Sequence, residues 1–372
     1  MSVKTAMLDI HVDSSLMSTS AQRSSVIQSI EEILKTYSLK RLQEIFLDSG
    51  KESFVVFGAS DNCVTCTLKT YKRGLISLTV EGDQDAVIFN DIKFEGLRKK
   101  LQELLESQVE KFSPSFFVRI PPLKRGSRIP LYLTSSDERI LEYDFDQVVF
   151  DAISPYQRVQ ILHSPTLGNC LILDDLQNLG ECDINYTHGL MKRGDLSYCN
   201  KEILILGGGD GGLLYELLKE KPKFITMVDI DKVVIDACKK YLRGACGDAL
   251  DQLKGENYEV IVDDCIKIMR EYKQKGKKFD YVINDLTDIP IATSPQGELW
   301  QFIHTIVSMA FELLQPNGRY LNHAIGDVCK EALTKYEELL KSLPYKVQFK
   351  NHSAYVPSFM ENWVFYEVWR AN

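Results

Sequence analysis

An apolar strand that runs directly into a series of glycines constrains the fold of this chain more than any other feature. Residues 203–206 are Ile-Leu-Ile-Leu, residues 207–212 are Gly-Gly-Gly-Asp-Gly-Gly, and leucines follow at 213, 214, 217 and 218 with helical spacing. A buried strand, a glycine turn and a helix in this order are typical of the first unit of a nucleotide-binding α/β sheet. The sequence therefore predicts such a sheet, beginning at residue 203.

One residue of the glycine loop indicates what the sheet binds. Gly207, Gly209 and Gly212 have the G-x-G-x-x-G spacing of dinucleotide-binding proteins. Asp210 lies among them, where the pyrophosphate of a dinucleotide would approach. Because a fixed carboxylate repels phosphate and attracts a cation, the loop favours an adenosyl ligand that carries positive charge, such as a sulfonium.

After residue 200 the hydrophobic pattern alternates between strands and helices. The pattern predicts strands at 203–206, 224–229, 258–262, 280–285 and 319–324, and helices at 213–220, 232–242, 265–275, 298–314 and 329–342. This alternation favours a parallel sheet with helices on both faces. Two last strands, near 346–352 and 362–369, are too close for a crossover helix, so we expect them to form an antiparallel hairpin at the sheet edge.

The rest of the chain divides by composition into further segments. Residues 1–115 are expected to form an α+β domain, and residues 127–190 a small antiparallel β domain. Between them, Pro121, Pro122 and Gly126 favour a linker over 116–126. The predicted fold class is α/β, with a Rossmann-like, mostly parallel sheet of the class I methyltransferase type over residues 191–372.

Charge and cysteine content exclude several classes of function. The chain has 44 Lys and Arg against 52 Asp and Glu, a net charge of −8, which argues against binding to nucleic acid or to an anionic membrane. We find no signal peptide and no apolar run long enough to span a membrane, and expect a cytoplasmic protein. The nine cysteines are scattered, and Cys63 and Cys66 form the only C-x-x-C pair, so we predict no metal site.

Four successive predicted strands of the sheet end in acidic residues. Asp210, Asp229, Asp264 and Asp285 follow them in order. Any one of these could cap a helix, but four at one rim would repel each other unless a cationic or donor-rich ligand lay between them. Asp229 lies 20 residues after Gly209, the separation at which an acid commonly binds ribose hydroxyls. Asp264 could accept a hydrogen bond from an adenine amino group, which leaves Asp210 and Asp285 to face the reacting cation.

Four motifs together resemble the polyamine aminopropyltransferases. They are Ser-Pro-Tyr-Gln at 154–157, the glycine loop at 204–212, Tyr-Val-Ile-Asn-Asp-Leu-Thr at 281–287 and Trp-Val-Phe-Tyr at 363–366. The resemblance spans about residues 120–370, and the Asn-Asp-Leu-Thr segment and the large N-terminal domain resemble the spermine-forming branch of the family. In that branch the N-terminal domain resembles S-adenosylmethionine decarboxylase and joins two subunits, which implies a homodimer here.

The resemblance also implies roles for individual residues. It places the aminopropyl donor, or methylthioadenosine, on Gln157, Asp229, Asp264 and Cys265, and the polyamine on Tyr186, Asp210, Phe359 and Glu361, with Asp285 as the proton acceptor. Two of these positions differ from the family pattern, because Asp229 replaces a Glu and Phe359 replaces a Tyr. Cys265 starts a predicted helix, whose dipole could lower the pKa of its thiol, but we favour a role in lining the adenine pocket through its backbone amide.

The implied reaction transfers an aminopropyl group from decarboxylated S-adenosylmethionine to spermidine, giving spermine and methylthioadenosine. The decarboxylated donor is a co-substrate, so no cofactor is expected, and the partners are small molecules. Spermidine or thermospermine synthesis is the nearest alternative. A methyltransferase and a non-catalytic partner subunit are more distant alternatives.

Overall fold

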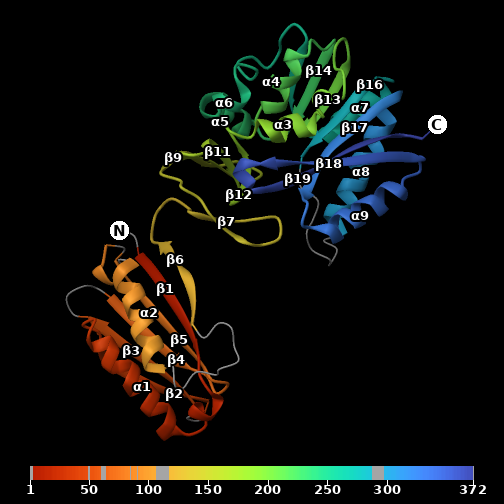
Figure 1. Ribbon diagram of the computed structural model, residues 1–372. Helices are drawn as coiled ribbons and strands as arrows, with labels where there is room; N and C mark the ends of the chain where they lie inside the picture. Colours follow the sequence, from red (N-terminus) through yellow and green to blue (C-terminus); the bar gives the residue numbers. More distant parts are fainter. Residues whose placement is uncertain are drawn as a thin grey trace. The chain divides into compact units, whose positions relative to one another are not determined.

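The computed structural model describes residues 3–48, 51–59, 64–83, 85–89, 91–105, 117–286 and 297–371. The chain divides into two compact units, Met1–Arg128 and Ile129–Asn372 (Figure 1). The elements of the first unit are β1 (Val3–His11), η1 (Ser14–Met17), α1 (Ser20–Lys35), β2 (Lys40–Leu47), β3 (Glu52–Ala59), β4 (Val64–Thr70), β5 (Leu75–Asp83), η3 (Val87–Phe89), α2 (Asp91–Leu105) and β6 (Phe117–Arg125).

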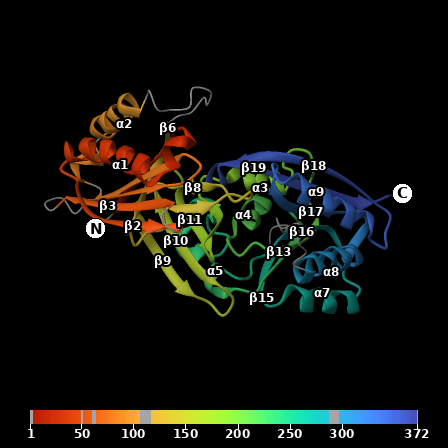
Figure 2. The same cartoon turned by 90° about the horizontal axis from the view of Figure 1, so that it is seen from below.

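The first unit is a six-stranded antiparallel sheet with two helices packed on one face. Its strand order is β2-β3-β4-β5-β1-β6. Helices α1 and α2 lie side by side in both views (Figures 1 and 2). Because side chains alternate across a strand, every second residue of β3, β4 and β5 is buried, for example Val55, Leu68 and Leu78, and these pack with Ile30 and Leu97 of the helices.

The predicted linker at 116–126 is wrong, because most of it is strand β6. This strand pairs antiparallel with β1, from Val3 opposite Arg125 to Ile10 opposite Phe117. The register shifts between Thr5 and Met7, at the point where β6 contains Pro121 and Pro122. Proline cannot donate to a sheet, but β6 is an edge strand with one neighbour, and a bulge there removes the need for the missing N–H groups.

The second unit begins with two small antiparallel sheets. Strands β7 (Tyr132–Thr134) and β8 (Ile140–Glu142) form a hairpin. Strands β9 (Gln147–Ile153), β10 (Arg158–Ser164), β11 (Gly168–Leu173) and β12 (Leu176–Gly180) form a four-stranded sheet in the order β12-β11-β10-β9. The antiparallel strands expected within residues 127–190 are therefore present, and the last residues of that segment, 184–190, form a helix, α3.

A seven-stranded sheet with helices on both faces forms the rest of the unit, and it confirms the Rossmann-like fold class. Its strand order is β15-β14-β13-β16-β17-β19-β18, parallel except at β19 and β18. Helices α3 and α4 lie on one face of this sheet and α7 and α8 on the other (Figure 2). The elements are α3 (Ile184–Leu190), β13 (Glu202–Gly207), α4 (Gly212–Lys219), β14 (Phe224–Asp229), α5 (Lys232–Tyr241), α6 (Arg243–Cys246), β15 (Tyr258–Val262), α7 (Cys265–Gln274), β16 (Phe279–Asp285), α8 (Gly297–Leu313), β17 (Leu314–Gly326), α9 (Lys330–Lys341), β18 (Val347–Val356), η4 (Pro357–Phe359) and β19 (Glu361–Arg370).

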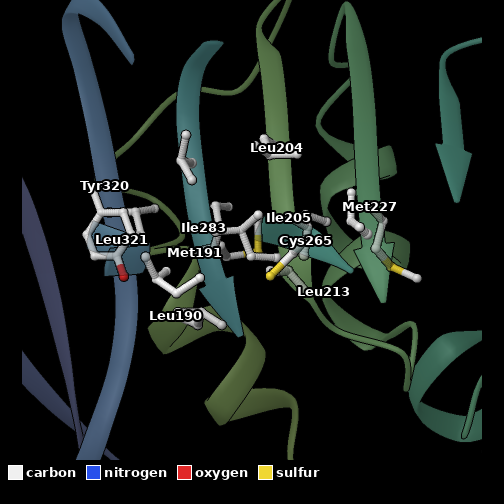
Figure 3. Close-up of a cluster of buried hydrophobic side chains, with 14 of the residues drawn as sticks. Leu190, Met191, Leu204, Ile205, Leu213, Met227, Cys265, Ile283, Tyr320 and Leu321 are labelled. Atoms are coloured by element: carbon white, nitrogen blue, oxygen red, sulfur yellow. The ribbon is translucent and has the colours of Figure 1, made fainter. Parts of the chain in front are cut away.

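The apolar strands make the core that fixes the site. Figure 3 shows Met227, Ile205, Ile283 and Leu321 from four neighbouring strands, together with Leu190 of α3. The order of the strands reverses between β13 and β16, because the chain runs outward from β13 to β15 and then returns to the other side of β13. In open α/β sheets ligands bind at the carboxyl ends of the strands at such a reversal.

Two features are absent from the part of the chain that the structure describes. None of its helices is both long enough and apolar enough to cross a membrane. None of its His, Cys, Asp and Glu side chains form a group of three or more that could hold a metal ion.

Candidate active site

A cavity of about 410 Å³ lies where the order of the strands reverses. The ends of β13, β14 and β16 contribute to its wall, together with the turn before β12, helix α3 and the last residue of η4. Single residues of α5, α8 and β17 also line it. Its charged lining residues, among those that the structure describes, are five aspartates and no lysine or arginine: Asp174, Asp210, Asp229, Asp231 and Asp285. Such a wall attracts a cation and repels phosphate.

The glycine loop brings the ends of β13 and β16 together. Gly207 has a φ of 80°, and a Cβ atom there would lie 2.1 Å from the backbone oxygen of Asp285. The N–H of Gly208 donates to that same oxygen at 3.2 Å. A side chain at Gly207 would therefore push the two strand ends apart, which explains the glycine in physical terms.

Asp229 is hydrogen-bonded to backbone amides, and its carboxyl has a raised pKa. Its carboxylate accepts hydrogen bonds from the N–H groups of Gly209 at 2.9 Å and Asp231 at 2.8 Å. Burial outweighs these two bonds and, with the nearby charges of Asp210 and Asp231, raises the pKa of Asp229 to about 6. A donor hydroxyl placed on this carboxylate would favour its ionised form.

Gln157 lines the cavity and is hydrogen-bonded to Asp231, another lining residue. No role was assigned to Asp231 from the sequence. The Asp231 carboxylate accepts from the side-chain N–H of Gln157 at 3.1 Å and from the hydroxyl of Ser154 at 2.6 Å. It also accepts from the N–H of Val233 at 2.9 Å and so caps α5. Asp231 therefore ties the Ser-Pro-Tyr-Gln turn to the second helix of the large sheet.

Asp210 and Asp285 both line the cavity. Asp210 accepts from the N–H of Gly212 at 2.7 Å, and burial raises the pKa of its carboxyl. Tyr186, on α3, donates its hydroxyl hydrogen to Oδ1 of Asp285 at 2.6 Å. The two carboxylates come from neighbouring strands, as the reading of the strand ends predicts.

His323 is a lining residue that sequence reasoning missed. Its Nε2 lies 4.0 Å from Oδ1 of Asp285, and its Nδ1 accepts from the indole N–H of Trp363 at 3.4 Å. Burial lowers the pKa of His323 to about 4, so the ring is neutral at physiological pH. Its position near the end of β17, the strand next to β16, is the feature that could have indicated a site residue. A single histidine in an apolar strand, however, has no distinctive spacing.

The far end of the cavity is aromatic and amide-lined. The ring of Phe359 lies 5.8 Å from that of Tyr186 and 4.7 Å from that of Trp363, in edge-on contacts. Gln177 and Asn178, which the sequence did not single out, line the wall beside it. This part of the wall therefore adds apolar surface and amides to the carboxylates of Asp174 and Asp285 nearby.

Three predicted site residues do not line the cavity. Asp264 is exposed and caps α7 by accepting from the N–H of Ile266 at 2.8 Å, and Cys265 follows it. The carboxylate of Glu361 is buried and accepts from the N–H of Ser136 at 3.0 Å and from its hydroxyl at 2.7 Å. Glu361 therefore uses its carboxylate to hold the turn after β7, and it is not among the residues that line the cavity.

The remaining predictions concern the thiol of Cys265 and the C-x-x-C pair of Cys63 and Cys66. The expected low pKa of the Cys265 thiol is wrong, because its burial outweighs the helix terminus and raises the pKa to about 12. Cys63 lies outside the described residues. Its C-x-x-C partner Cys66 is buried in the first unit, which raises the pKa of that thiol.

Comparison with known proteins identifies the family. Residues 184–372, just over half of the chain, match the spermine/spermidine synthase domain, and residues 132–181 match the spermidine synthase tetramerisation domain. The chain belongs to the spermine/spermidine synthase family. The resemblance that the four motifs indicate is thereby confirmed.

The chain matches only part of the length of each of these relatives, and about half of the first one. The polyamine aminopropyltransferase of Sulfurisphaera tokodaii is 41% identical over 157 residues, which are 41% of this chain and 50% of that protein. The thermospermine synthase ACAULIS5 of Arabidopsis thaliana is 28% identical over 238 residues, 62% of this chain and 66% of that protein. The solved spermidine synthase of Thermotoga maritima has the same fold, with a TM-score of 0.53 at 21% identity, over 65% of this chain and 79% of that one.

Proposed function

We propose that this protein transfers an aminopropyl group from decarboxylated S-adenosylmethionine to spermidine, forming spermine and methylthioadenosine. The observation that carries the proposal is the cavity wall of five aspartates with no lysine or arginine among its described lining residues. Both proposed reactants are cations, so each gains from this wall. Membership of the spermine/spermidine synthase family supports the same chemistry.

The donor is proposed to lie along the glycine loop. Its ribose hydroxyls would donate to Asp229, and Gln157 would contact the same end of the molecule. Its sulfonium would lie near Asp210. Asp264 and Cys265, which follow the neighbouring strand β15, are close to this end through the pairing of β14 with β15, and we keep them as proposed contacts to adenine.

Removal of a proton from the acceptor is the main chemical difficulty. An amine with a pKa near 10.4 requires about 4.6 kcal/mol to be neutral at pH 7. The sulfonium lowers this cost by repelling the ammonium form, and Asp285 is proposed to accept the proton. The nitrogen then forms a bond to the carbon next to sulfur while the carbon–sulfur bond breaks, and the electron pair stays on sulfur in neutral methylthioadenosine.

Tyr186 and the aromatic end of the cavity would position the acceptor. The hydroxyl of Tyr186 is bonded to Oδ1 of Asp285, so it orients the proposed base. Phe359 lines the cavity with an apolar ring where the family has a tyrosine hydroxyl. Glu361 is proposed to receive a distal ammonium of the acceptor, and its bonds to Ser136 hold the turn after β7 against the start of β19.

The choice of acceptor separates the proposal from its alternatives. Spermidine synthesis would use a shorter diamine, and thermospermine synthesis, the activity named for the Arabidopsis relative, would attach the group to the other end of spermidine. A methyltransferase would have to place the donor's carboxylate against the aspartates, which is unfavourable. A non-catalytic subunit would have no need for Asp285 beside a tyrosine hydroxyl.

Assembly and location are proposals of the same kind. We propose a homodimer through the N-terminal unit, in the cytoplasm, with small molecules as the only other partners. The match of residues 132–181 to a tetramerisation domain supports an oligomer. Sedimentation of the full chain and of a chain without the first unit measures how much the first unit, and how much residues 132–181, contribute to the oligomer.

Product analysis tests the proposed function. The protein is incubated with S-adenosylmethionine or its decarboxylated form, and with putrescine or spermidine, and products are separated by mass and by isomer. We expect spermine and methylthioadenosine from the decarboxylated donor with spermidine. Transfer of a methyl group, or no release of methylthioadenosine with any polyamine, would contradict the proposal.

A further inference from the structure

We call the part of the cavity lined by Tyr186 and Phe359, where the acceptor is proposed to bind, the acceptor end. A buried polar cluster lies next to this end. It joins the small antiparallel sheet to η4 through Asp183 and Ser358, which are 2% and 0% exposed. Neither side chain lines the cavity. We call this pair, with its hydrogen bonds, the Asp183–Ser358 clamp.

Every polar atom of Ser358 is bonded within the cluster. Its N–H donates to Oδ1 of Asp183 at 2.9 Å, and its hydroxyl donates to Oδ2. Its carbonyl accepts from the hydroxyl of Tyr143 at 2.7 Å, and its Oγ accepts from the amide of Gln177 at 3.0 Å. The Asp183 carboxylate accepts a further bond from the N–H of Gly180 at 2.6 Å.

Asp183 is used in an unusual way for its position. It is the N-cap residue of α3, where an aspartate ordinarily accepts from the free amides of the first turn. Its side chain makes no such capping bond and turns to η4 instead. Burial raises the pKa of its carboxyl, so the charge is held there at a cost that only the surrounding donors offset.

The clamp connects two residues of the cavity wall. Tyr186 lies three residues after Asp183 on α3, and Phe359 directly follows Ser358 in η4. Both rings line the cavity, with centroids 5.8 Å apart. A change in the separation of α3 and η4 would therefore alter the acceptor end and leave the glycine loop in place.

We propose that Asp183 is a positioning residue that fixes the width of the acceptor end of the cavity by holding η4 against the start of α3. The proposal rests on the proposed function, because it assigns the polyamine to that end. It locates a determinant of polyamine affinity outside the cavity lining.

The substitutions Asp183→Asn and Ser358→Ala test this role. Asparagine has the same shape but presents an N–H₂ group to at least one of the donors that Asp183 now accepts, whereas alanine at 358 keeps the backbone N–H and loses the hydroxyl. We expect each variant to raise the KM for the polyamine by about tenfold or more, with the KM for the donor and the Kd for methylthioadenosine within about twofold of wild type. The double variant should be less impaired than the product of the two single effects.

Asp280→Asn provides a matched control. The Asp280 carboxylate also accepts from a backbone amide, that of Glu202 at 3.0 Å, and from Lys201 at 3.2 Å, but it lies at the amino ends of the strands. We expect this variant to lose stability without a change in the KM for the polyamine. Parallel rises in both KM values for Asp183→Asn would overturn the positioning role.

Hydrogen exchange separates failure of the clamp from failure of the proposed function. The clamp predicts faster exchange of the Ser358 N–H in Asp183→Asn than in wild type, in the absence of any substrate. Unchanged protection of that amide would contradict the clamp even if the enzyme is active. If the Ser358 N–H exchanges faster in Asp183→Asn but the wild-type protein turns over no polyamine, the clamp stands and the proposed function is overturned. If Asp183→Asn does not fold, Ser358→Ala carries the KM measurement alone.

Discussion

The pKa of Asp229 predicts how nucleoside binding depends on pH. Methylthioadenosine is uncharged near neutral pH, so a pH effect on its affinity reports on the protein. With a pKa of about 6, Asp229 is about 99% ionised at pH 8 and about 9% ionised at pH 5. A hydrogen bond to a charged group contributes about 1.5–3 kcal/mol and one to a neutral group about 0.5–1.5 kcal/mol, so protonation of the Asp229 carboxylate weakens the contact by about 1–1.5 kcal/mol. Because about 9% of the carboxylate is still ionised at pH 5, the affinity should fall about five- to tenfold between pH 8 and pH 5.

The sign of this effect follows from the direction of the shift. Burial raises the pKa of Asp229 in the free protein, so the proton that binds as the pH falls through 6 competes with the ribose hydroxyls. Titration calorimetry of methylthioadenosine at intervals from pH 8 to pH 5 measures the slope. Asp229→Asn should bind more weakly at pH 8 and show a flat profile.

Asp263→Asn is the control for this measurement. Asp263 lies at the end of the neighbouring strand but pairs with Lys267 at 2.5 Å, which lowers the pKa of its carboxyl. It should not titrate in this range, and the variant should retain the wild-type slope. A flat wild-type profile, or an equal slope in Asp229→Asn, would refute the assignment of Asp229 to the ribose.

Three substitutions test other parts of the site. Tyr186→Phe removes the bond to Asp285 and should lower kcat by about 10- to 100-fold in steady-state assays, with methylthioadenosine binding retained; unchanged kcat would show that the hydroxyl is dispensable. Gly207→Ala should destabilise the protein by about 2 kcal/mol or more in denaturant titrations and abolish nucleoside binding, because of its positive φ and the 2.1 Å overlap; wild-type stability would mean that the loop can shift. Glu361→Gln should raise the KM for spermidine more than Ser136→Ala does; an equal rise would show that Glu361 acts only through its bonds to Ser136 and does not contact the polyamine.

The large sheet could be predicted from the sequence because its strands are short apolar runs with a helical pattern between them. The strand expected at 224–229 is β14 to the residue, and the expected final hairpin is β18 and β19. The first unit was harder to predict. Its β1 and β2 contain too many polar residues for a clear alternation, and the prolines of β6 indicated a linker because an edge position cannot be recognised before the sheet is known.

The site was predictable where its residues follow a strand of the large sheet. Asp210, Asp229 and Asp285 line one cavity because parallel strands end at one rim. His323 and Gln177 were missed because their places depend on how β17 and the turn before β12 pack, which no local spacing records. Glu361 shows the converse, since a motif match gives its position along β19 but not the partner that its carboxylate selects.

The role of Asp285 is the central claim, and Asp285→Asn tests it most directly. The variant keeps an oxygen that can accept from Tyr186 but cannot take a proton from an amine. Single-turnover rates with decarboxylated S-adenosylmethionine and spermidine, measured beside the Kd for methylthioadenosine, separate chemistry from binding. The account predicts a loss of at least about 100-fold in the rate of transfer with nucleoside affinity within about twofold of wild type. Transfer at the wild-type rate would contradict it.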